Sequence, residues 1–280
     1  MMLKKSKDII TNNIKLNSFY IIVSVVVFTA AVATALLVLY NNTSLLPSSF
    51  DYRVFAQEDN ATATNLTNSN STLIDFVFVS DLEQIRAHLN AAMMNKQAGN
   101  NSLAQAHVLH PIAEIYSSIE PQIANANMTL NQTLASNLNE LSQIVNSSTT
   151  DEFNTQAQKI NGLVNQTVKQ VVPVETGDNS TFGLVVADLL STASEEYDVA
   201  VENGTITNIL EYQDGQAFVS RAQDLMVQAS SSTGLPPQEQ TLEIQETNKL
   251  FSDLNTAIQN KSSPEAVDTS IRAIIHEISK

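Results

Sequence analysis

The residues of this sequence best suited to chemistry are three closely spaced side chains in the segment AHVLHPIAEIYSSIEP. His107 and His110 lie three residues apart, and Glu114 follows four residues after His110. On a helix, this spacing places all three side chains on one face. Imidazole and carboxylate groups are good ligands for iron, copper or zinc. We therefore predict a metal site formed by these three residues, with His88 of the preceding antiparallel helix as a fourth ligand.

The same residues also fit an ordinary structural role. Two partly exposed histidines and a solvated glutamate are unremarkable on a helical bundle, and Pro111 between them can disturb the shared helical face. The spacing also lacks the specificity of an HExxH sequence. The residues alone leave both interpretations open.

A second candidate cluster consists of carboxylates in the segment EEYDVAVENGTITNILEYQDGQAF, which also contains Glu202 and Asp214. Carboxylates that face each other across a bundle can bind a hard cation. The candidate ligands of this cluster are Glu195, Glu196 and Glu211 of this segment, together with Glu120 from the first unit. In the alternative interpretation the acidic side chains coat the outer faces. Tyr197 and Tyr212 then bury their rings and direct their hydroxyls toward a turn or a neighbouring helix.

Composition argues against several other classes of function. The 14 Lys and Arg residues against 29 Asp and Glu residues give a net charge of −15, which disfavours binding to nucleic-acid phosphates. The sequence has no Cys, which excludes disulfides, thiolate metal sites and a Cys nucleophile. It also contains no G-x-S-x-G, HExxH or glycine-rich phosphate-binding motif. We therefore expect neither an enzyme nor a partner of nucleic acid.

Apolar residues at helical spacing predict the elements that position the first candidate site. Residues 75–173 are expected to form one four-helix unit. The apolar stripe of its first helix consists of Leu82, Ile85, Leu89, Ala92 and Met93. The three helices that follow are expected over about 102–119, 130–145 and 153–171. We expect the second of the four helices to bend at Pro111 and to end at Glu120-Pro121.

The second candidate cluster belongs to a second four-helix unit, expected over residues 180–280 after a linker at 174–179. Its helices are expected over about 184–202, 206–230, 237–259 and 263–280. Asn203-Gly204 ends the first of these helices, as Gly99-Asn100 ends the first helix of the preceding unit. Aligning the two glycines indicates a weak internal repeat of two related units.

An apolar run from Phe19 to Tyr40 contains 22 residues without a charge, enough for a helix to cross a bilayer core of ~30 Å. Four lysines and one acidic residue precede it, a balance that keeps the short tail of residues 1–18 in the cytoplasm. The fold class that we predict is therefore all-α. It has one N-terminal transmembrane helix over residues 19–40, followed by two antiparallel four-helix-bundle units.

Several features agree with export of the chain beyond this run. All thirteen Asn-x-Ser/Thr glycosylation sequons lie after it, and this part contains 10 basic against 28 acidic residues. Residues 41–74, rich in Asn, Thr and Ser, are expected to form a polar stalk. Ala56 ends a small-residue sequence like a signal-peptidase site, but the long apolar run favours a retained anchor. We expect a single-pass membrane glycoprotein with an acidic extracytoplasmic part.

The segment ASEEYDVAVENGTITNILEYQDGQAFVSRAQDL resembles a pattern of the high-affinity iron permease family. That pattern reads D/E-Y-x-x-A-V-x-x-G-x-I/V-x-x-x-E-Y-x-x-x-x-x-F and lies in the extracytoplasmic helical region of those permeases. Residues 80–121, with Gly99, Tyr116 and Glu120-Pro121, are similar to a companion unit of the same proteins. The resemblance covers residues 80–121 and 187–226. It implies a stand-alone relative of the metal-handling domain, without the permease's channel and its Arg-Glu-x-x-Glu motifs.

These observations lead to two hypotheses for function. The first is a membrane-anchored extracytoplasmic protein that binds a metal cation, iron or copper first, as an accessory to metal uptake or sensing. Its expected partner is a metal permease or another envelope protein. The alternative is a non-catalytic surface interaction or structural ectodomain, in which both bundles only present faces to another protein. Metal binding predicts that an added ion raises the thermal midpoint of unfolding, whereas the alternative predicts no rise.

Overall fold

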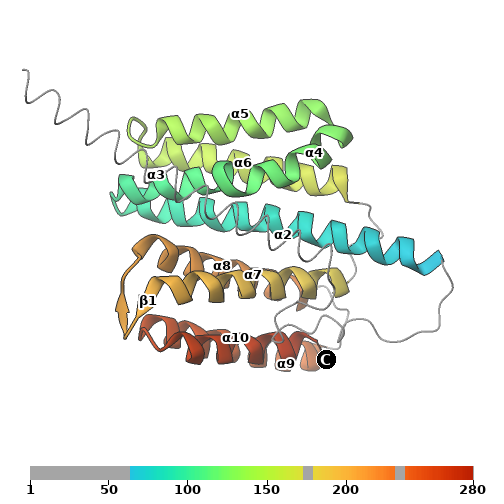
Figure 1. Ribbon diagram of the computed structural model, residues 1–280, viewed down its shortest axis with the longest axis vertical. Coiled ribbons are helices and arrows are strands. Elements are labelled where there is room, and N and C mark those ends of the chain that lie inside the picture. Colours follow the sequence, from blue (N-terminus) through green and yellow to red (C-terminus); the bar gives the residue numbers. More distant parts are fainter. Residues whose placement is uncertain (1–63, 173–178, 231–236, 280) are drawn as a thin grey trace, which may run out of the picture. The chain divides into compact units, whose positions relative to one another are not determined.

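The computed structural model describes residues 64–172, 179–230 and 237–279 (Figure 1). The expected cytoplasmic tail, the apolar run at 19–40, the signal-peptidase-like sequence around Ala56 and most of the expected stalk lie outside these residues. Within the described ranges no helix is both long and apolar enough to cross a membrane. The described residues are all-α apart from one two-residue hairpin, which confirms the predicted class for this part of the chain.

The first group of helices follows the predicted order and begins earlier than expected. Its elements are α2 (Thr64–Gln97), α3 (Asn101–His110), the π-helical turn η2 (Pro111–Ile115), α4 (Tyr116–Ala126), α5 (Met128–Ile144) and α6 (Thr150–Val171). Residues 64–74, which we assigned to the stalk, are the first turns of α2. We predicted a stalk there from the polar composition alone. These polar residues nevertheless belong to the same helix as the apolar segment that follows them.

Two prolines act differently from each other in the second helix of this group. At Pro111 the helix widens into η2 and then continues as α4, so the predicted bend is a local π-helical turn. Proline has no N–H to donate to the carbonyl four residues earlier, and a wide turn accommodates that loss. Pro121 lies inside α4, which continues to Ala126. The predicted end at Glu120-Pro121 is therefore wrong.

Side-chain caps define the later helix starts. Asn127 accepts a hydrogen bond from the backbone N–H of Leu130 at the start of α5. Thr149 and Glu152 form a reciprocal capping box at the start of α6. These short-range signals explain why the third and fourth helices lie within a few residues of their predicted bounds.

The second group consists of α7 (Asn179–Ala200), strands β1 (Val201–Glu202) and β2 (Thr205–Ile206), α8 (Ile209–Ser230), α9 (Pro237–Gln259) and α10 (Pro264–Ile278). The first helix ends at Ala200, before the predicted Glu202. The reason is a hairpin in which Val201 pairs with Ile206 and Glu202 with Thr205. Asn203 and Gly204 both have positive φ, 52° and 73°, as the tight turn of a two-residue hairpin requires.

Each group surrounds its own hydrophobic core, and α2 contributes to both. Leu82, Ile85 and Leu89 of α2 are fully buried in the core of the first group. Phe76 and Ala87 of the same helix are buried in the core of the second group. Figure 1 shows α2 running beside α7 and α8, and its contacts with α3 and α6 lie on its other side. The predicted apolar stripe of this helix is confirmed.

Candidate metal centre

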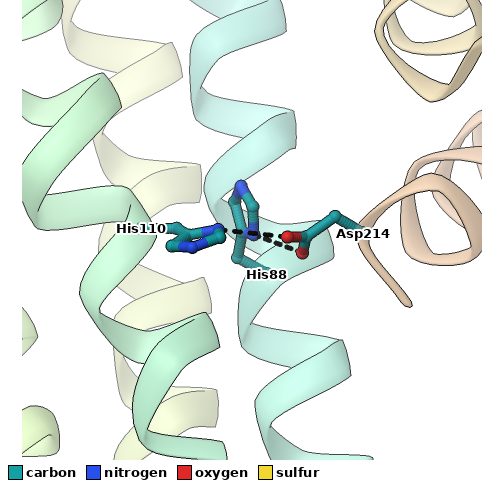
Figure 2. A group of neighbouring side chains, drawn as sticks. All are labelled: His88, His110 and Asp214. Carbon is teal, nitrogen blue, oxygen red and sulfur yellow. Dashed lines mark ion pairs between the residues drawn. The ribbon is translucent and has the colours of Figure 1, made fainter. Parts of the chain in front are cut away.

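Three histidines and one aspartate converge where α2, α3 and α8 meet. Nδ1 of His88 and Nδ1 of His107 lie 2.8 and 2.9 Å from Oδ1 of Asp214. Nδ1 of His110 lies 3.0 Å from Oδ2 of the same carboxylate. Figure 2 shows His88 and His110 directed toward Asp214 from separate helices. Asp214 therefore gathers all three imidazoles at one carboxylate, which we call the His/Asp centre.

The His/Asp centre is almost completely shielded from solvent. The side chains of His88, His107 and Asp214 are 4%, 0% and 1% exposed, and that of His110 is 15% exposed. The ring of Phe218 meets the ring of His88 edge to face, with centroids 5.1 Å apart. This apolar contact closes one side of the centre. Solvent therefore has access mainly beside His110.

Two buried atoms of the centre make close ionic contacts without well-aligned hydrogen bonds. Nδ1 of His88 lies 2.8 Å from Oδ1 of Asp214, and Oδ2 of Asp214 lies 3.0 Å from Nδ1 of His110, but neither atom meets a partner at a hydrogen-bonding angle among the described residues. Both atoms are ligand atoms of the same three-residue group, formed by His88, His110 and Asp214, whose ligand atoms all lie within 4.8 Å of one another. This group could hold a metal ion, which would satisfy both atoms at once.

The separations within the centre fit ligands of one ion. Two donor atoms bound at right angles to a metal at ~2.1 Å lie ~2.9 Å apart. Nδ1 of His88 lies 2.8 Å from Oδ1 of Asp214 and Nδ1 of His110 lies 3.0 Å from Oδ2, separations that suit both ion pairs and the two oxygens of a carboxylate that binds one ion. Two histidines and one carboxylate form the donor set of mononuclear non-haem Fe(II) sites. The residues present therefore fit a transition-metal ion such as iron.

His107 differs from the other two histidines because both of its ring nitrogens have partners. Its Nδ1 is hydrogen-bonded to Asp214, and its Nε2 lies 2.8 Å from Oε1 of Gln213. Asn95 donates to the same Gln213 oxygen at 2.9 Å and is itself bonded to the carbonyl of Ala91. This chain of contacts fixes Asp214 in place. His107 therefore orients the carboxylate, and the converging ligand group does not include it.

The carboxylate of Asp214 and the imidazoles beside it stabilise each other's charged forms. Burial alone would raise the pKa of Asp214, but the three imidazoles beside it hold that pKa well below its usual range. Burial alone would lower the pKa of His110, but contact with Asp214 raises it, with smaller contributions from Glu114 and Glu211. Asp214 is therefore an ionised acceptor at neutral pH. An anionic oxygen is the form that binds a cation.

Three further carboxylates surround the open side of the centre. Glu196 of α7 and Glu211 of α8 lie within hydrogen-bonding reach of each other. Burial, followed by this contact with Glu211, raises the pKa of Glu196 well above its usual range. Glu114 of η2 is close enough to act electrostatically on both Glu196 and His110. The structure thus brings the two clusters that we expected separately into one neighbourhood.

Two residues of the predicted set lie elsewhere. Glu120 is exposed on α4, where its carboxylate lies 3.5 Å from the amide nitrogen of Asn131. Glu195 is exposed on α7, and its nearest charge is that of Asp188. Neither residue contacts the His/Asp centre in the described structure.

Local structure explains how the site residues reach one another. His110 ends α3 immediately before η2, and Glu114 belongs to that wide turn. Gly215 follows Asp214 at the closest approach of α7 and α8, where an added Cβ would lie 3.2 Å from the carbonyl of Ala193. A side chain at this position would press against the backbone of α7, the helix that carries Glu196.

The tyrosines of the second cluster have structural roles. The hydroxyl of Tyr197 donates to the carbonyl of Ser262 at 2.8 Å, and that of Tyr212 donates to the carbonyl of Ile258 at 3.0 Å. Both rings are buried. Burial raises the pKa of Tyr197 to about 12, with a smaller contribution from Tyr212. The prediction that these rings are buried, with their hydroxyls at a turn or neighbouring helix, is confirmed.

Asp214 is the residue on which all three histidines converge, yet our candidate set from the sequence did not contain it. It was visible only as one of several acidic residues in EEYDVAVENGTITNILEYQDGQAF. The one local signal is the adjacent Gly215, which indicates a close helix approach beside a carboxylate. Its partner His107 lies 107 residues earlier in the chain, and His88 lies earlier still. Local spacing in the sequence therefore could not reveal that these residues meet.

Comparison with known proteins identifies part of the chain. Residues 175–280 match the family described as the iron permease-associated 4-helix bundle domain. No curated protein and no solved structure matches the chain. The matched part contains α7 to α10 and hence Asp214, Glu196 and Glu211. The three histidines belong to α2 and α3, which precede it.

Proposed function

We propose that this protein binds a transition-metal cation, iron or copper first, at the His88, His110 and Asp214 group. The observation that carries the proposal is the convergence of these three residues, whose potential ligand atoms all lie within 4.8 Å of one another at a buried site. The 2-His-1-carboxylate donor set favours Fe(II) over hard cations such as Ca²⁺, which prefer oxygen ligands alone. His107 holds Asp214 in position through the contact of its Nδ1 with Oδ1 of that carboxylate.

The biological setting that we propose is accessory to metal uptake or sensing. The match at residues 175–280 supports an association with iron permeases, because the domain is described by that association. The apolar run at 19–40 and the one-sided sequons support a single-pass anchor with the helical part outside the cytoplasm. A metal permease, or another envelope protein, is the partner that this setting implies. The proposed role is binding and presentation of the ion, without catalysis.

Thermal unfolding of the full-length, metal-stripped chain tests the proposal. Fe(II) under anaerobic conditions, Fe(III), Cu(II), Zn(II) and Ca(II) would be added separately. An ion that binds only the folded state stabilises it by about 2.7 kcal/mol at one hundred times its Kd. We expect Fe(II) or Cu(II) to raise the midpoint and Ca(II) to leave it unchanged.

A pair of variants makes the test specific. His88→Ala/His110→Ala removes two ligands and should abolish the shift. His276→Ala is the matched control, because His276 is the chain's fourth histidine and lies exposed on α10, outside the centre. The proposal fails if no ion raises the midpoint of the unmodified chain, or if the shift survives in the double variant. In that case the alternative of a surface interaction module gains support.

A further inference from the structure

Seven Asn-x-Ser/Thr sequons lie where the structure describes the side chains, and they fall into two groups. Four have their asparagine in a turn, between α2 and α3, between α5 and α6, at the tip of the β1–β2 hairpin, and between α9 and α10. We call these the turn sequons, and their asparagines are Asn100, Asn146, Asn203 and Asn260. The other three sequons begin at Asn127, Asn131 and Asn165.

The four turn sequons lie at the same end of the helices, opposite the start of α2 (Figure 1). Nζ of Lys96, near the end of α2, donates to the carbonyl of Ser148 at 2.9 Å, which joins the first two turns. A Cβ on Gly204 would lie 3.8 Å from the carbonyl of Lys261, which places the hairpin tip beside the α9–α10 turn. Packing of α2 on α8 brings the two pairs of turns together.

The asparagine side chains of the turn sequons are free to react. All four are exposed. Within the described part of the chain none of their amide groups forms a hydrogen bond, and Asn100 precedes α3 without capping it through its side chain. An N-glycosylation acceptor must lie on the surface, where the transferase can reach it. The turn sequons meet this requirement.

The other three sequons have asparagines whose amide oxygens are already engaged. Asn127 caps α5 through its side chain. Asn131 is 5% exposed, and its amide oxygen accepts from the hydroxyl of Tyr116. The amide oxygen of Asn165 accepts from the guanidinium of Arg86 at 2.7 Å. Exposure and hydrogen bonding therefore separate the two groups of sequons.

Turn chemistry alone explains only half of this pattern. Asparagine is favoured in turns, and Asn203 has a positive φ of 52°, which asparagine tolerates better than most residues. That preference does not require a Ser or Thr two positions later. Each of the four turns nevertheless has one, at Ser102, Ser148, Thr205 and Ser262.

We propose that Asn100, Asn146, Asn203 and Asn260 carry N-linked glycans that together cover one end of the helical part. The inference rests on the proposed placement of this part outside the cytoplasm and is independent of the metal site. Glycans are bulky and solubilising, so this end is closed to protein contacts. A partner protein then binds the sides of the helices or their opposite end.

The modification is a transfer from a lipid-phosphate-linked oligosaccharide, catalysed by a membrane transferase. The side-chain amide nitrogen of asparagine forms a bond to the anomeric carbon of the oligosaccharide. The bond between that carbon and the phosphate oxygen breaks, and the lipid phosphate leaves with the bonding electrons. The amide nitrogen releases one proton to a base of the transferase.

Site-resolved mass spectrometry tests the proposal on the full-length protein purified from its native membranes. After proteolysis, the glycosylated and bare forms of the peptide around each of the seven asparagines are compared. We expect glycans on the four turn asparagines and bare peptides for Asn127, Asn131 and Asn165. The last three are internal controls, because they have the same sequon in the same molecules.

A pair of variants at Thr205 makes the test specific. Thr205 is exposed, and replacing it leaves Asn203 and its turn unchanged. Thr205→Ala breaks the sequon, so we expect the glycan on Asn203 to disappear. Thr205→Ser, the matched control, keeps the sequon and should keep the glycan. Both variants should retain the glycans on the other three turns, and circular dichroism verifies that they are folded.

Three results would overturn the proposal. They are bare peptides at the four turn asparagines, equal modification of Asn131 and Asn165, and a modification of Asn203 that survives in Thr205→Ala. Protease treatment of intact cells identifies the cause of an unmodified chain. A digested, unmodified chain overturns the glycans and keeps the proposed placement, whereas a protected chain overturns both. The metal site is tested separately by the ion-dependent unfolding.

Discussion

The two faces of α2 differ in chemistry although they belong to one helix. The face toward the first group carries Leu82, Ile85 and Leu89, all fully buried among apolar side chains. The face toward α7 and α8 makes polar contacts along its length. Ser80 and Gln84 donate to Asp188, Glu83 accepts from Arg221, His88 faces Asp214, and Asn95 bonds Gln213. We call these the apolar face and the polar face of α2.

The difference between the two faces shows how one helix can serve stability and chemistry separately. Burial of apolar area is strong and non-directional, so the apolar face stabilises the first group without specifying its register. Buried polar contacts stabilise less but need defined partners at defined positions. The polar face therefore fixes how α7 and α8 align with α2. That alignment brings Asp214 to the histidines.

The largest expected effect comes from the apolar face. Leu89→Ala removes a fully buried side chain from the first core and leaves a cavity, so the free energy of unfolding should fall by about 3–4 kcal/mol. Urea denaturation measures this change. Met94→Ala is the control, because Met94 is 72% exposed on the same helix and its loss should cost under about 0.5 kcal/mol. A similar loss in both variants would contradict the contrast between the faces.

The second prediction concerns a buried ion pair on the polar face. Glu83 accepts from Nε of Arg221 at 2.6 Å and lies 3.2 Å from Nε of Arg86. Glu83→Ala leaves two guanidinium groups without their carboxylate, so we expect a loss of about 2–3 kcal/mol in unfolding free energy. Lys249→Ala, which breaks an exposed pair with Asp253, should cost under about 0.5 kcal/mol. Equal effects in the two variants would show that the polar face is energetically an ordinary surface.

A third prediction tests the close approach of α7 and α8 behind the site. In Gly215→Ala the new Cβ meets backbone atoms of α7, so the helices must separate by a few tenths of an ångström. We expect a loss of about 1–2 kcal/mol in stability and a weaker metal affinity, since Asp214 moves with α8. Gly162→Ala on α6 is the control, because nothing lies within 4 Å of its new Cβ. That change should stabilise the helix by up to about 1 kcal/mol. Calorimetry and metal titration of both variants measure these effects.

The smallest expected effect is a dependence of stability on pH that arises from Asp81, between the apolar and polar faces of α2. The pKa of Asp81 is raised to about 6, mainly by burial. A hydrogen bond from Ser118 opposes this rise, and the charge of Asp188 adds a smaller increase. The folded state thus binds the proton of Asp81 more tightly than the unfolded state. The stabilisation is complete below the ordinary pKa of 3.8 and is lost as pH rises through about 6.

Asp81→Asn removes this dependence. The variant's free energy of unfolding serves as the reference. Relative to it, the unmodified chain should lose about 1 kcal/mol of stability between pH 5 and pH 6. Denaturation at a series of pH values measures it. Asp151→Asn, at an exposed position in the first turn of α6, provides a comparison from outside this border. A difference that does not vary with pH would show that Asp81 is ionised at the same pH in both states.

Local patterns in the sequence were sufficient to predict most helices. Apolar residues three and four apart predicted the buried stripe from Leu82 to Ala92, and the bounds of α9 were predicted as they are observed. The misses came where backbone geometry overrode pattern. Pro121 lies within a continuing helix, and Asn203-Gly204 closes a hairpin where we expected only the end of a helix.

The candidate metal centre could be predicted only in part from the sequence. His107, His110 and Glu114 are close in the chain, so helical spacing identified them as neighbours. The polar face of α2 gave no such signal, because polar residues at helical spacing read as a solvated surface. Asp214 could not be selected from the surrounding acidic residues, since nothing local distinguishes the carboxylate that turns inward.

The sequence by itself determined the helices, the acidic character of the protein and the presence of histidines and carboxylates able to bind a metal. These properties depend on residue type and on contacts within a few positions of the chain. Only the tertiary structure decided that His88, His110 and Asp214 share one site, and that His107 holds the carboxylate. The reason is that α2 and α8 meet through packing between distant parts of the chain. Glu83 and Arg221, for example, form a contact although 138 positions separate them. Contacts at such separations produce no periodic pattern in the sequence.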